Sequence, residues 1–250
     1  MSDSSASPLA PMLRKLQYWA TFSESDREAL LALPHSLKTI EQAGFVVREG
    51  DQPTHSCLLR SGFLYRHKIV ADGARQIVAL HMSGDMVDLQ NSLLRLADHS
   101  VQALTRAEVA FIPREAIQEM AFTRPAIGMA MWHDTLVDGS VFREWIANVG
   151  RRDARTRLAH LLCEFALRLE AAGLGEHNKW ELPMTQEQLA DATGLTPVHV
   201  NRTLKTLGVD GLIVRNKRSV TVANWKQLAA AGDFQSSYLH MPQEKLNLVQ

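Results

Sequence analysis

The chain has 250 residues, of which 46% are hydrophobic, and its 27 Lys and Arg residues balance its 27 Asp and Glu residues. This composition excludes a disordered chain and is typical of a globular protein with two domains. No apolar run approaches the ~18–20 residues of a membrane helix, and residues 1–8 lack the basic start and apolar stretch of a secretion signal. We therefore expect a cytoplasmic protein with no membrane partner.

The two cysteines, Cys57 and Cys163, lie far apart in the sequence. They form neither a disulfide framework nor the spacing of a metal finger, which agrees with a reducing compartment. Apolar residues flank Cys57, so we interpret it as a packed and inert side chain, with a redox switch as the alternative.

The charges are distributed unevenly, although they cancel over the whole chain. Residues 150–230 carry 12 Lys and Arg against 8 Asp and Glu, a net charge of +4, and the remainder carries −4. A mildly basic C-terminal third beside an acidic remainder is the asymmetry that a modular DNA-binding protein shows.

The N-terminal half predicts short helices followed by many short strands. Residues 12–33 have a helical pattern, and residues 36–113 break into β-like runs between turn residues. Asp72-Gly73 indicates a hairpin with a type I′ turn, in which both central residues have positive φ. Many closely spaced strands predict a sandwich or barrel. The runs are 39–40, 45–48, 56–59, 62–70, 76–82, 101–103 and 109–112.

A short helix is predicted over residues 114–122, and Pro125 opens a long helix over residues 125–149. The long helix is apolar on two sides, and both must be buried. We expect one side to face its own barrel and the other to face a second copy of the chain; the alternative is that both pack inside one chain. The first side holds Ile127, Met131, Phe142, Trp145, Ile146 and Val149, and the second holds Met129, Trp132 and Leu136.

The C-terminal third predicts one amphipathic helix after Gly150 and then two short helices joined by a tight turn. Thr185 and Gln188 form a capping box, and Gly194 stands where a left-handed conformation ends the first short helix. Thr196 caps the second, with Pro197 at its first position. This pattern describes a helix-turn-helix.

The second short helix separates into a buried and an exposed side when it is wound at about 100° per residue. Arginine can bond two acceptors of a guanine, asparagine can do the same for adenine, and valine can contact the methyl group of thymine. We therefore expect the exposed side to read bases in the major groove. The core side holds Val200, Thr203, Leu204 and Leu207; the exposed side holds Val198, His199, Asn201, Arg202, Lys205 and Thr206.

The residues that follow predict a β-hairpin with its tip at Asn216-Lys217. Lys217 and Arg218, together with Lys205, are expected to contact DNA phosphates. A helix-turn-helix followed by such a hairpin is a winged helix, so double-stranded DNA is the expected partner. An ordinary helical hairpin with a solvated basic face is the alternative.

These motifs resemble the Crp/Fnr family of bacterial transcription regulators over nearly the whole chain. The most specific match is Leu182-Pro-Met-Thr-Gln-Glu-Gln-Leu-Ala, with Gly194-Leu195-Thr196 and Asn201-Arg202-Thr203-Leu204. The resemblance implies an α+β chain with four parts. These are an N-terminal double-stranded β-helix (jelly-roll) sensor domain over 1–124, a dimerisation helix over 125–149, a winged helix-turn-helix over 150–230 and a flexible tail over 231–250.

The resemblance also implies roles for individual residues. The family arginine that matches Arg202 contacts a base or phosphate, and the residues around Val198 and His199 set the operator preference. Members with glutamate at the position of Val198 read a well-known palindrome, so that operator is not assumed for this chain. A homodimer on a two-fold symmetric operator is implied, with RNA polymerase as a candidate further partner.

The sensor domain departs from the cyclic-nucleotide pattern of the family. Gly84-Asp85 matches its turn, but Asp88-Leu89 replaces a Gly-Glu pair and His99-Ser100 replaces an Arg-Ser pair. The missing glutamate would accept from the ribose hydroxyl and the missing arginine would pair with the phosphate, whereas Asp88 adds a repulsive charge. These residues mark the expected effector pocket; its ligand is unknown and is not expected to be cyclic AMP.

No cofactor or metal is expected either. Iron–sulfur members carry cysteines near the N-terminus, and this chain has none before Cys57. Cys57, His67, His81 and His99 lie in the sensor domain without the spacing of haem or metal ligands.

An enzyme is the rival class of protein. The chain lacks the Gly-x4-Gly-Lys-Ser/Thr, His-Glu-x2-His and Gly-x-Ser-x-Gly motifs, so no enzymatic activity is expected. A small-molecule or redox-sensing module without sequence-specific DNA binding is the second alternative, but it leaves the basic face of the second short helix unexplained.

Overall fold

The computed structural model describes residues 7–241. Their contacts divide them into two compact units. The first unit runs to Lys68 and continues from Ala79 to Gly139; the second contains Ile69–Val78 and the chain from Ser140 onward. Within residues 7–241 no helix is both long enough and apolar enough to cross a membrane.

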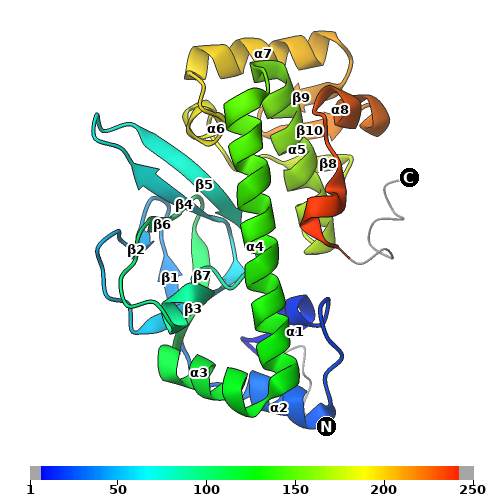
Figure 1. The fold of residues 1–250 in the computed structure, drawn as a ribbon. Helices are drawn as coiled ribbons and strands as arrows, with labels where there is room; N and C mark the ends of the chain where they lie inside the picture. The colour runs from blue at the N-terminus through cyan, green and yellow to red at the C-terminus, as the bar shows by residue number, and fades with distance from the viewer. Residues whose placement is uncertain (1–6, 242–250) are drawn as a thin grey trace. The chain divides into compact units, whose positions relative to one another are not determined.

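The strands of the N-terminal half form two sheets (Figure 1). They are β1 (Ser36–Ile40), β2 (Phe45–Val47), β3 (His55–Ser61), β4 (Leu64–Ile69), β5 (Arg75–His81), β6 (Ser100–Ala103) and β7 (Ala107–Pro113). One sheet has the order β1-β7-β3 and the other β2-β6-β4-β5. Each predicted β-like run coincides with one of these strands, so the prediction of a β-rich N-terminal domain is confirmed.

Strand β3 packs on both of its faces. Cys57 and Leu59 belong to the core that Leu64 and Val101 of the other sheet complete, whereas Leu58 lies in a second core among helices. Successive side chains of a strand point to opposite faces, so one strand supplies both cores. The apolar run of β3 therefore reflects burial on two sides.

Four helices contribute to the second core. They are α1 (Ala10–Leu16), α2 (Glu24–Leu31), α3 (Arg114–Thr123) and the start of α4 (Pro125–Arg151). Gly128 allows α4 to lie against the end of α3, because a Cβ at this position would stand 2.4 Å from the carbonyl oxygen of Ala121. The short η1 (Leu89–Ser92) lies between β5 and β6 in the chain.

The loop between β4 and β5 differs from the predicted type I′ turn. Gly73 has a φ of +84°, but Asp72 is not among the residues with positive φ. The amide of Ala74 donates to Oδ1 of Asp72 at 2.9 Å, and the amide of Val70 donates to the carbonyl of Ala74 at 2.9 Å. The aspartate side chain thus stabilises a longer loop, as Asx turns do. The predicted hairpin is confirmed, but the predicted turn type is wrong.

The two apolar sides of α4 differ from the predicted ones at one position. Ile127, Met131 and Trp145 are buried, but Ile146 is 69% exposed although the sequence placed it with them. Met129, Trp132 and Leu136 are also exposed, by 57–60%. At about 100° per residue Ile146 lies at the edge of the predicted side, as close to Trp132 as to Phe142. The buried side of α4 is therefore narrower than predicted, and Ile146 lies on the exposed side.

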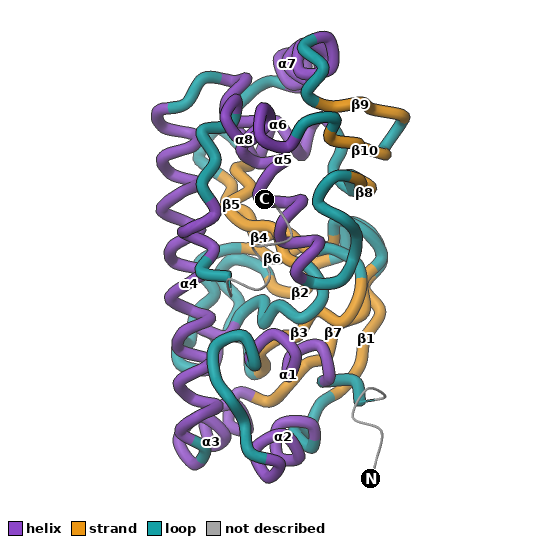
Figure 2. Tube along the Cα trace, turned by 90° about the vertical axis from the view of Figure 1, so that its right-hand side faces the viewer, coloured by secondary structure: helices purple, strands orange, loops and turns teal. Residues whose placement is uncertain are grey.

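The second unit contains a small sheet among helices (Figure 2). The sheet order is β8-β10-β9. The strand β8 and the helix α8 were not predicted, because each has too few residues to show a period. The elements are α5 (Ala154–Ala171), β8 (Lys179–Glu181), α6 (Gln186–Thr193), α7 (Pro197–Val209), β9 (Ile213–Asn216), β10 (Ser219–Val222), α8 (Trp225–Ala231) and η2 (Ser236–Leu239).

The expected flexible tail is packed over its described part. Leu239 is buried, and the hydroxyl of Tyr238 donates to Glu164 of α5 at 2.8 Å. The expectation is therefore corrected for residues 232–241, whose aromatic side chains find partners on α5. Residues 242–250 of the predicted tail, like residues 1–6, lie outside the described part of the chain.

Replacing Leu58 by alanine should lower the free energy of unfolding by about 2–5 kcal/mol, because it leaves a cavity at a fully buried position. Urea unfolding followed by circular dichroism measures this change. The control is Leu37→Ala on β1, where the side chain is 49% exposed and the change should stay within about 0.5 kcal/mol. Equal losses in both variants would contradict the assigned core.

Candidate nucleic-acid interface and sensor site

Helices α6 and α7 form the predicted helix-turn-helix. Thr185 and Gln188 make a reciprocal capping box, with hydrogen bonds of 2.9 and 3.2 Å. Gly194 ends α6 in the left-handed conformation, at φ +63°. The hydroxyl of Thr196 accepts from the amide of His199 at 3.2 Å, and Pro197 is the first residue of α7. These local signals end and begin the helices where the sequence predicted.

Burial of one face determines how α7 is rotated about its own axis. Val200, Thr203, Leu204 and Leu207 are buried, as predicted. This face packs against α5 and α6. The opposite face is consequently presented to solvent.

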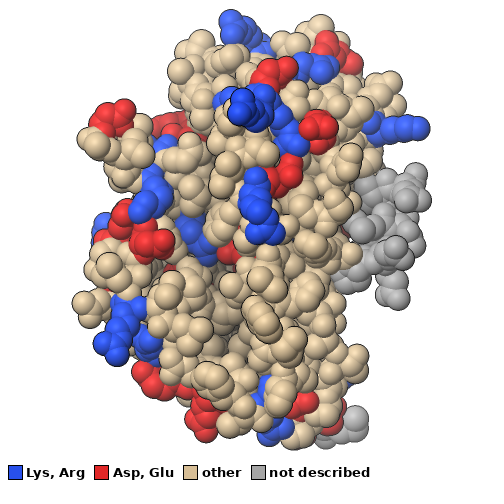
Figure 3. Space-filling view, viewed as in Figure 1, with Lys and Arg blue, Asp and Glu red and all other residues tan. Residues whose placement is uncertain are grey.

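The exposed face of α7 carries the residues predicted to read bases. Val198 is 80% exposed and Arg202 is exposed, whereas His199 and Asn201 are half-buried. Lys205, like Thr206 beside it, is exposed. The first turn of α7 contains no acidic residue. The surface over α7 accordingly presents Lys and Arg side chains, with Asp and Glu beside them (Figure 3).

The wing differs slightly from the prediction. Asn216 pairs with Ser219, so the turn consists of Lys217 and Arg218 rather than Asn216 and Lys217. Lys217 adopts a φ of +55°, and both turn residues are exposed. Arg215 on β9 is exposed as well and was not among the predicted contacts. The basic tip of the hairpin is therefore one residue further along the chain.

Two arginines of α5 form hydrogen bonds with residues at the ends of α6 and α7. Arg157 donates from Nη1 to the carbonyl of Thr193, the last residue of α6, at 3.0 Å. A cation at this end of a helix meets the negative end of the helix dipole. Arg155 donates from Nη2 to Asp210, which follows α7, at 2.8 Å. One charge of this basic region is thus paired with a surface carboxylate of the same unit.

The predicted effector-pocket residues do not form one cluster of free side chains. Asp88 is fully buried, and its Oδ1 lies 3.0 Å from Nε2 of His99 and 3.8 Å from Nη2 of Arg66. Arg66 also donates to the carbonyl of Val87 and, at 3.1 Å, to Asp138 of α4. Arg66 was not predicted, because its sequence neighbourhood gives no sign of the partners.

The other predicted pocket residues lie in different surroundings. Asp85 pairs with Nζ of Lys15 at 2.8 Å, and Lys15 also lies 3.0 Å from Asp134 of α4. Gly84, which has a φ of +98°, lies against the backbone of α1. Ser100 accepts from the amide of Glu49 at 3.0 Å. Leu89, the first residue of η1, packs partly buried against the helical core.

These ion pairs change the interpretation of Asp88 that the sequence suggested. The sequence suggested a carboxylate that would repel a phosphate; here its charge already has two cationic or hydrogen-bonding partners within the same domain. Cys57 is buried nearby, and burial together with the charge of Asp88 raises the pKa of its thiol well above the ordinary value. The thiolate, which is the reactive form, is therefore disfavoured.

Both halves of the chain match known families. Residues 37–124 match the cyclic nucleotide-binding domain, and residues 156–231 match the Crp-like helix-turn-helix domain. The transcriptional activator FnrL of Cereibacter sphaeroides is 29% identical over 225 residues, which cover 87% of this chain and 90% of FnrL. The fumarate and nitrate reduction regulatory protein of Salmonella typhimurium is 24% identical over 212 residues, with 84% of each chain covered.

A solved structure has the same architecture. FixK2 from Bradyrhizobium japonicum superimposes with a TM-score of 0.73 at 22% identity, over 80% of this chain and 98% of FixK2. Fold and site thus define a DNA-binding protein with a winged helix-turn-helix and a cyclic-nucleotide-binding-like β domain. The chain belongs to the Crp/Fnr family, and it is a DNA-binding transcription regulator of that type.

Acid should destabilise the protein through His81. Burial, opposed by Asp85, lowers the pKa of His81 below its ordinary 6.5. Above pH 6.5 the side chain is neutral in the folded and unfolded states; below it the unfolded chain takes up the proton first, so the free energy of unfolding falls. Urea unfolding between about pH 5 and 8 measures this slope. His81→Gln should make the slope shallower, with part of it left because burial also lowers the pKa of His160. An unchanged slope in His81→Gln would refute the assignment.

Proposed function

We propose that this chain is a homodimer that reads a two-fold symmetric operator with α7 in the major groove. The observation that carries the proposal is the exposed face of α7, which has Val198 and Arg202 one helical turn apart and a basic wing beside it. Arg202, Asn201, His199 and Val198 would read bases. Lys205, Lys217 and Arg218, with the cap Thr196, would contact the sugar–phosphate backbone.

The exposed seam of α4 supports the dimer. Met129, Trp132, Leu136 and Ile146 are spaced as a and d positions of a heptad repeat, with Gly139 and Arg143 at the two positions between the last pair. Apolar a and d positions pair two helices in a coiled coil. Few charged side chains lie over the first half of α4 (Figure 3). An exposed apolar stripe of this kind is typical of a protein–protein interface. Two copies joined along it would place two copies of α7 about 34 Å apart, one helical turn of DNA.

The sensor domain would respond to a signal other than a cyclic nucleotide. Leu89 and His99 stand where the resemblance expects the glutamate and the arginine that anchor such a ligand, and His99 is already paired with the buried Asp88. We place the protein in the cytoplasm, with RNA polymerase as a candidate partner and no catalytic activity of its own.

The proposal is tested by selecting bound duplexes from a random DNA pool with the purified full-length protein and no added ligand. A two-fold symmetric motif is expected. Recovery of a single half-site would contradict the dimer. Enrichment of no sequence, both alone and with cell extract added, would contradict sequence-specific reading and favour a module that binds only a small molecule.

Removing the guanidinium in Arg202→Ala should weaken binding to the selected operator by ~1–3 kcal/mol and relax the preference at one base position. Lys217→Ala should weaken all duplexes alike and reduce the salt dependence, because it removes a phosphate contact. Fluorescence anisotropy with matched and mismatched operators measures both. Unchanged operator affinity in Arg202→Ala, or a sequence-selective loss in Lys217→Ala, would overturn these roles.

Leu136→Glu should convert the dimer to a monomer, because it places a charge in the apolar seam of α4. Size-exclusion chromatography with light scattering measures the mass of the particle. The control is Leu37→Glu on β1, which changes another exposed leucine outside the seam. A dimer that survives Leu136→Glu would assign the interface to a different surface.

A further inference from the structure

Only Arg152 and Asp153 separate the end of α4 from the start of α5. Two helices joined by two residues can change their angle unless other contacts prevent it. This angle is important for the position of α7. The second half of α4 contains Ile146 of the proposed dimer seam, and α7 packs against α5. Whatever fixes this angle also fixes the direction in which α7 points.

A buried carboxylate ties α4 to α5. Glu164 of α5 is almost fully buried, and it accepts from Nε1 of Trp145 on α4 at 3.1 and 3.0 Å. Arg168, one turn further along α5, donates to the same carboxylate at 3.2 Å. Burying a carboxylate destabilises the fold unless hydrogen bonds compensate for the lost hydration. Glu164 therefore favours the arrangement in which its partners stay bonded to it.

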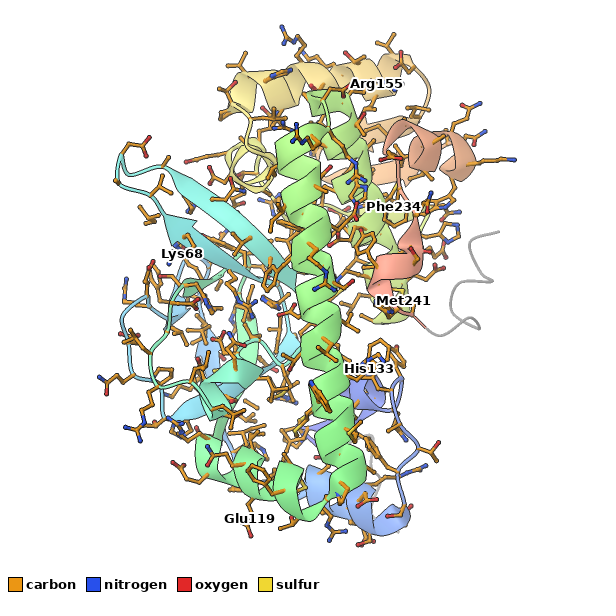
Figure 4. All side chains as sticks on the ribbon, in the orientation of Figure 1. Lys68, Glu119, His133, Arg155, Phe234 and Met241 are labelled. Carbon is orange, nitrogen blue, oxygen red and sulfur yellow. The ribbon has the colours of Figure 1, made fainter. Side chains whose placement is uncertain are left out.

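The C-terminal segment, residues 232–241, completes this arrangement from the other side. Figure 4 labels Phe234 near its start and Met241 at its end. The hydroxyl of Tyr238 donates to Oε2 of Glu164 at 2.8 Å. One carboxylate of α5 therefore receives hydrogen bonds from α4 and from the C-terminal segment at once.

His160, one turn before Glu164, holds the start of the C-terminal segment. Its Nδ1 donates to the carbonyl of Gly232 at 3.0 Å, and its Nε2 lies 3.0 Å from the hydroxyl oxygen of Tyr238. The ring stacks on Tyr238 and meets the edge of Phe234. A Cβ at Gly232 would stand 2.7 Å from the backbone nitrogen of His160, so only glycine allows this approach.

A second connection starts from the two-residue link itself. Arg152 pairs with Glu144 of α4 at 2.7 Å and with Asp233 of the C-terminal segment at 3.0 Å. Glu144 in turn lies 3.6 Å from His160 of α5. The C-terminal segment is thus bonded to the link and to α5, and both of these are bonded in turn to α4.

We propose that the C-terminal segment is the positioning element that fixes the angle between α4 and α5 and thereby the spacing of the two DNA half-sites. The inference rests on the proposed dimer and deepens it. Loss of the segment's contacts leaves the face of α7 intact, since its buried residues pack on α5 and α6. The base preference within a half-site should then persist while the permitted spacing broadens.

The test is selection from a random DNA pool with full-length Tyr238→Phe and Gly232→Ala. Tyr238→Phe removes only the hydrogen bonds of the hydroxyl, and Gly232→Ala forces the segment away from α5. Both should recover the wild-type half-site. Their preference for the wild-type spacing over spacings one base pair longer or shorter should fall by roughly tenfold, the factor for one hydrogen bond to a charged group. The control is Gln235→Ala, at an exposed position of the same segment.

A second measurement does not depend on DNA. A nitroxide is attached to Val209→Cys, an 88% exposed position at the end of α7; Cys57 and Cys163 are buried. The distance distribution between the two labels of a dimer should be broader in Tyr238→Phe than in the wild-type background. Thermal unfolding of each variant shows how far stability alone has changed.

Three outcomes decide the matter. A broadened spacing and distance distribution with an unchanged half-site supports the positioning role. Unchanged spacing and distances, with only a lower melting temperature, would show that the segment merely stabilises and would overturn the inference. A wild-type protein that selects no symmetric site contradicts the proposed function instead; unaltered label distances in the variants would then refute the positioning role independently.

Discussion

The DNA-binding surface depends on the burial of one side of α7. The core of the second unit contains one side of the helix, namely Val200, Thr203, Leu204 and Leu207. This burial fixes the orientation of α7 about its own axis. Arg202 and Val198 face solvent as a consequence. The caps at both ends of α6 and at the start of α7 add a further constraint, because they fix where each helix begins and ends.

Buried ions connect the elements that carry function. In the first unit Asp134 and Asp138, one turn apart on α4, pair with Lys15 of α1 and Arg66 of β4. In the second unit the buried Glu164 of α5 accepts hydrogen bonds from Trp145 of α4 and from Tyr238 of the C-terminal segment. Breaking one such pair costs far more than a surface contact, since the remaining charge stays buried without its partner. Helix α4 is therefore held within each unit by charge as well as by apolar packing.

Local patterns were enough to predict most elements. The strands of the β domain alternate or run continuously apolar, and the helix-turn-helix carries its capping box, its glycine and its proline at fixed offsets. Patterns failed at two places. The turn after β4 depends on a hydrogen bond to the side chain of Asp72, and Ile146 lies at the edge of the buried side of α4, where the period does not decide between burial and exposure.

The sequence by itself determined the order of the elements, the helix-turn-helix and the exposed face of α7, because capping and periodicity act between residues a few positions apart. The tertiary structure alone decided which charges meet. Arg66 finds Asp88 and Asp138, and Tyr238 finds Glu164 across 74 positions of the chain. No spacing rule links such residues; only the packed fold brings them together.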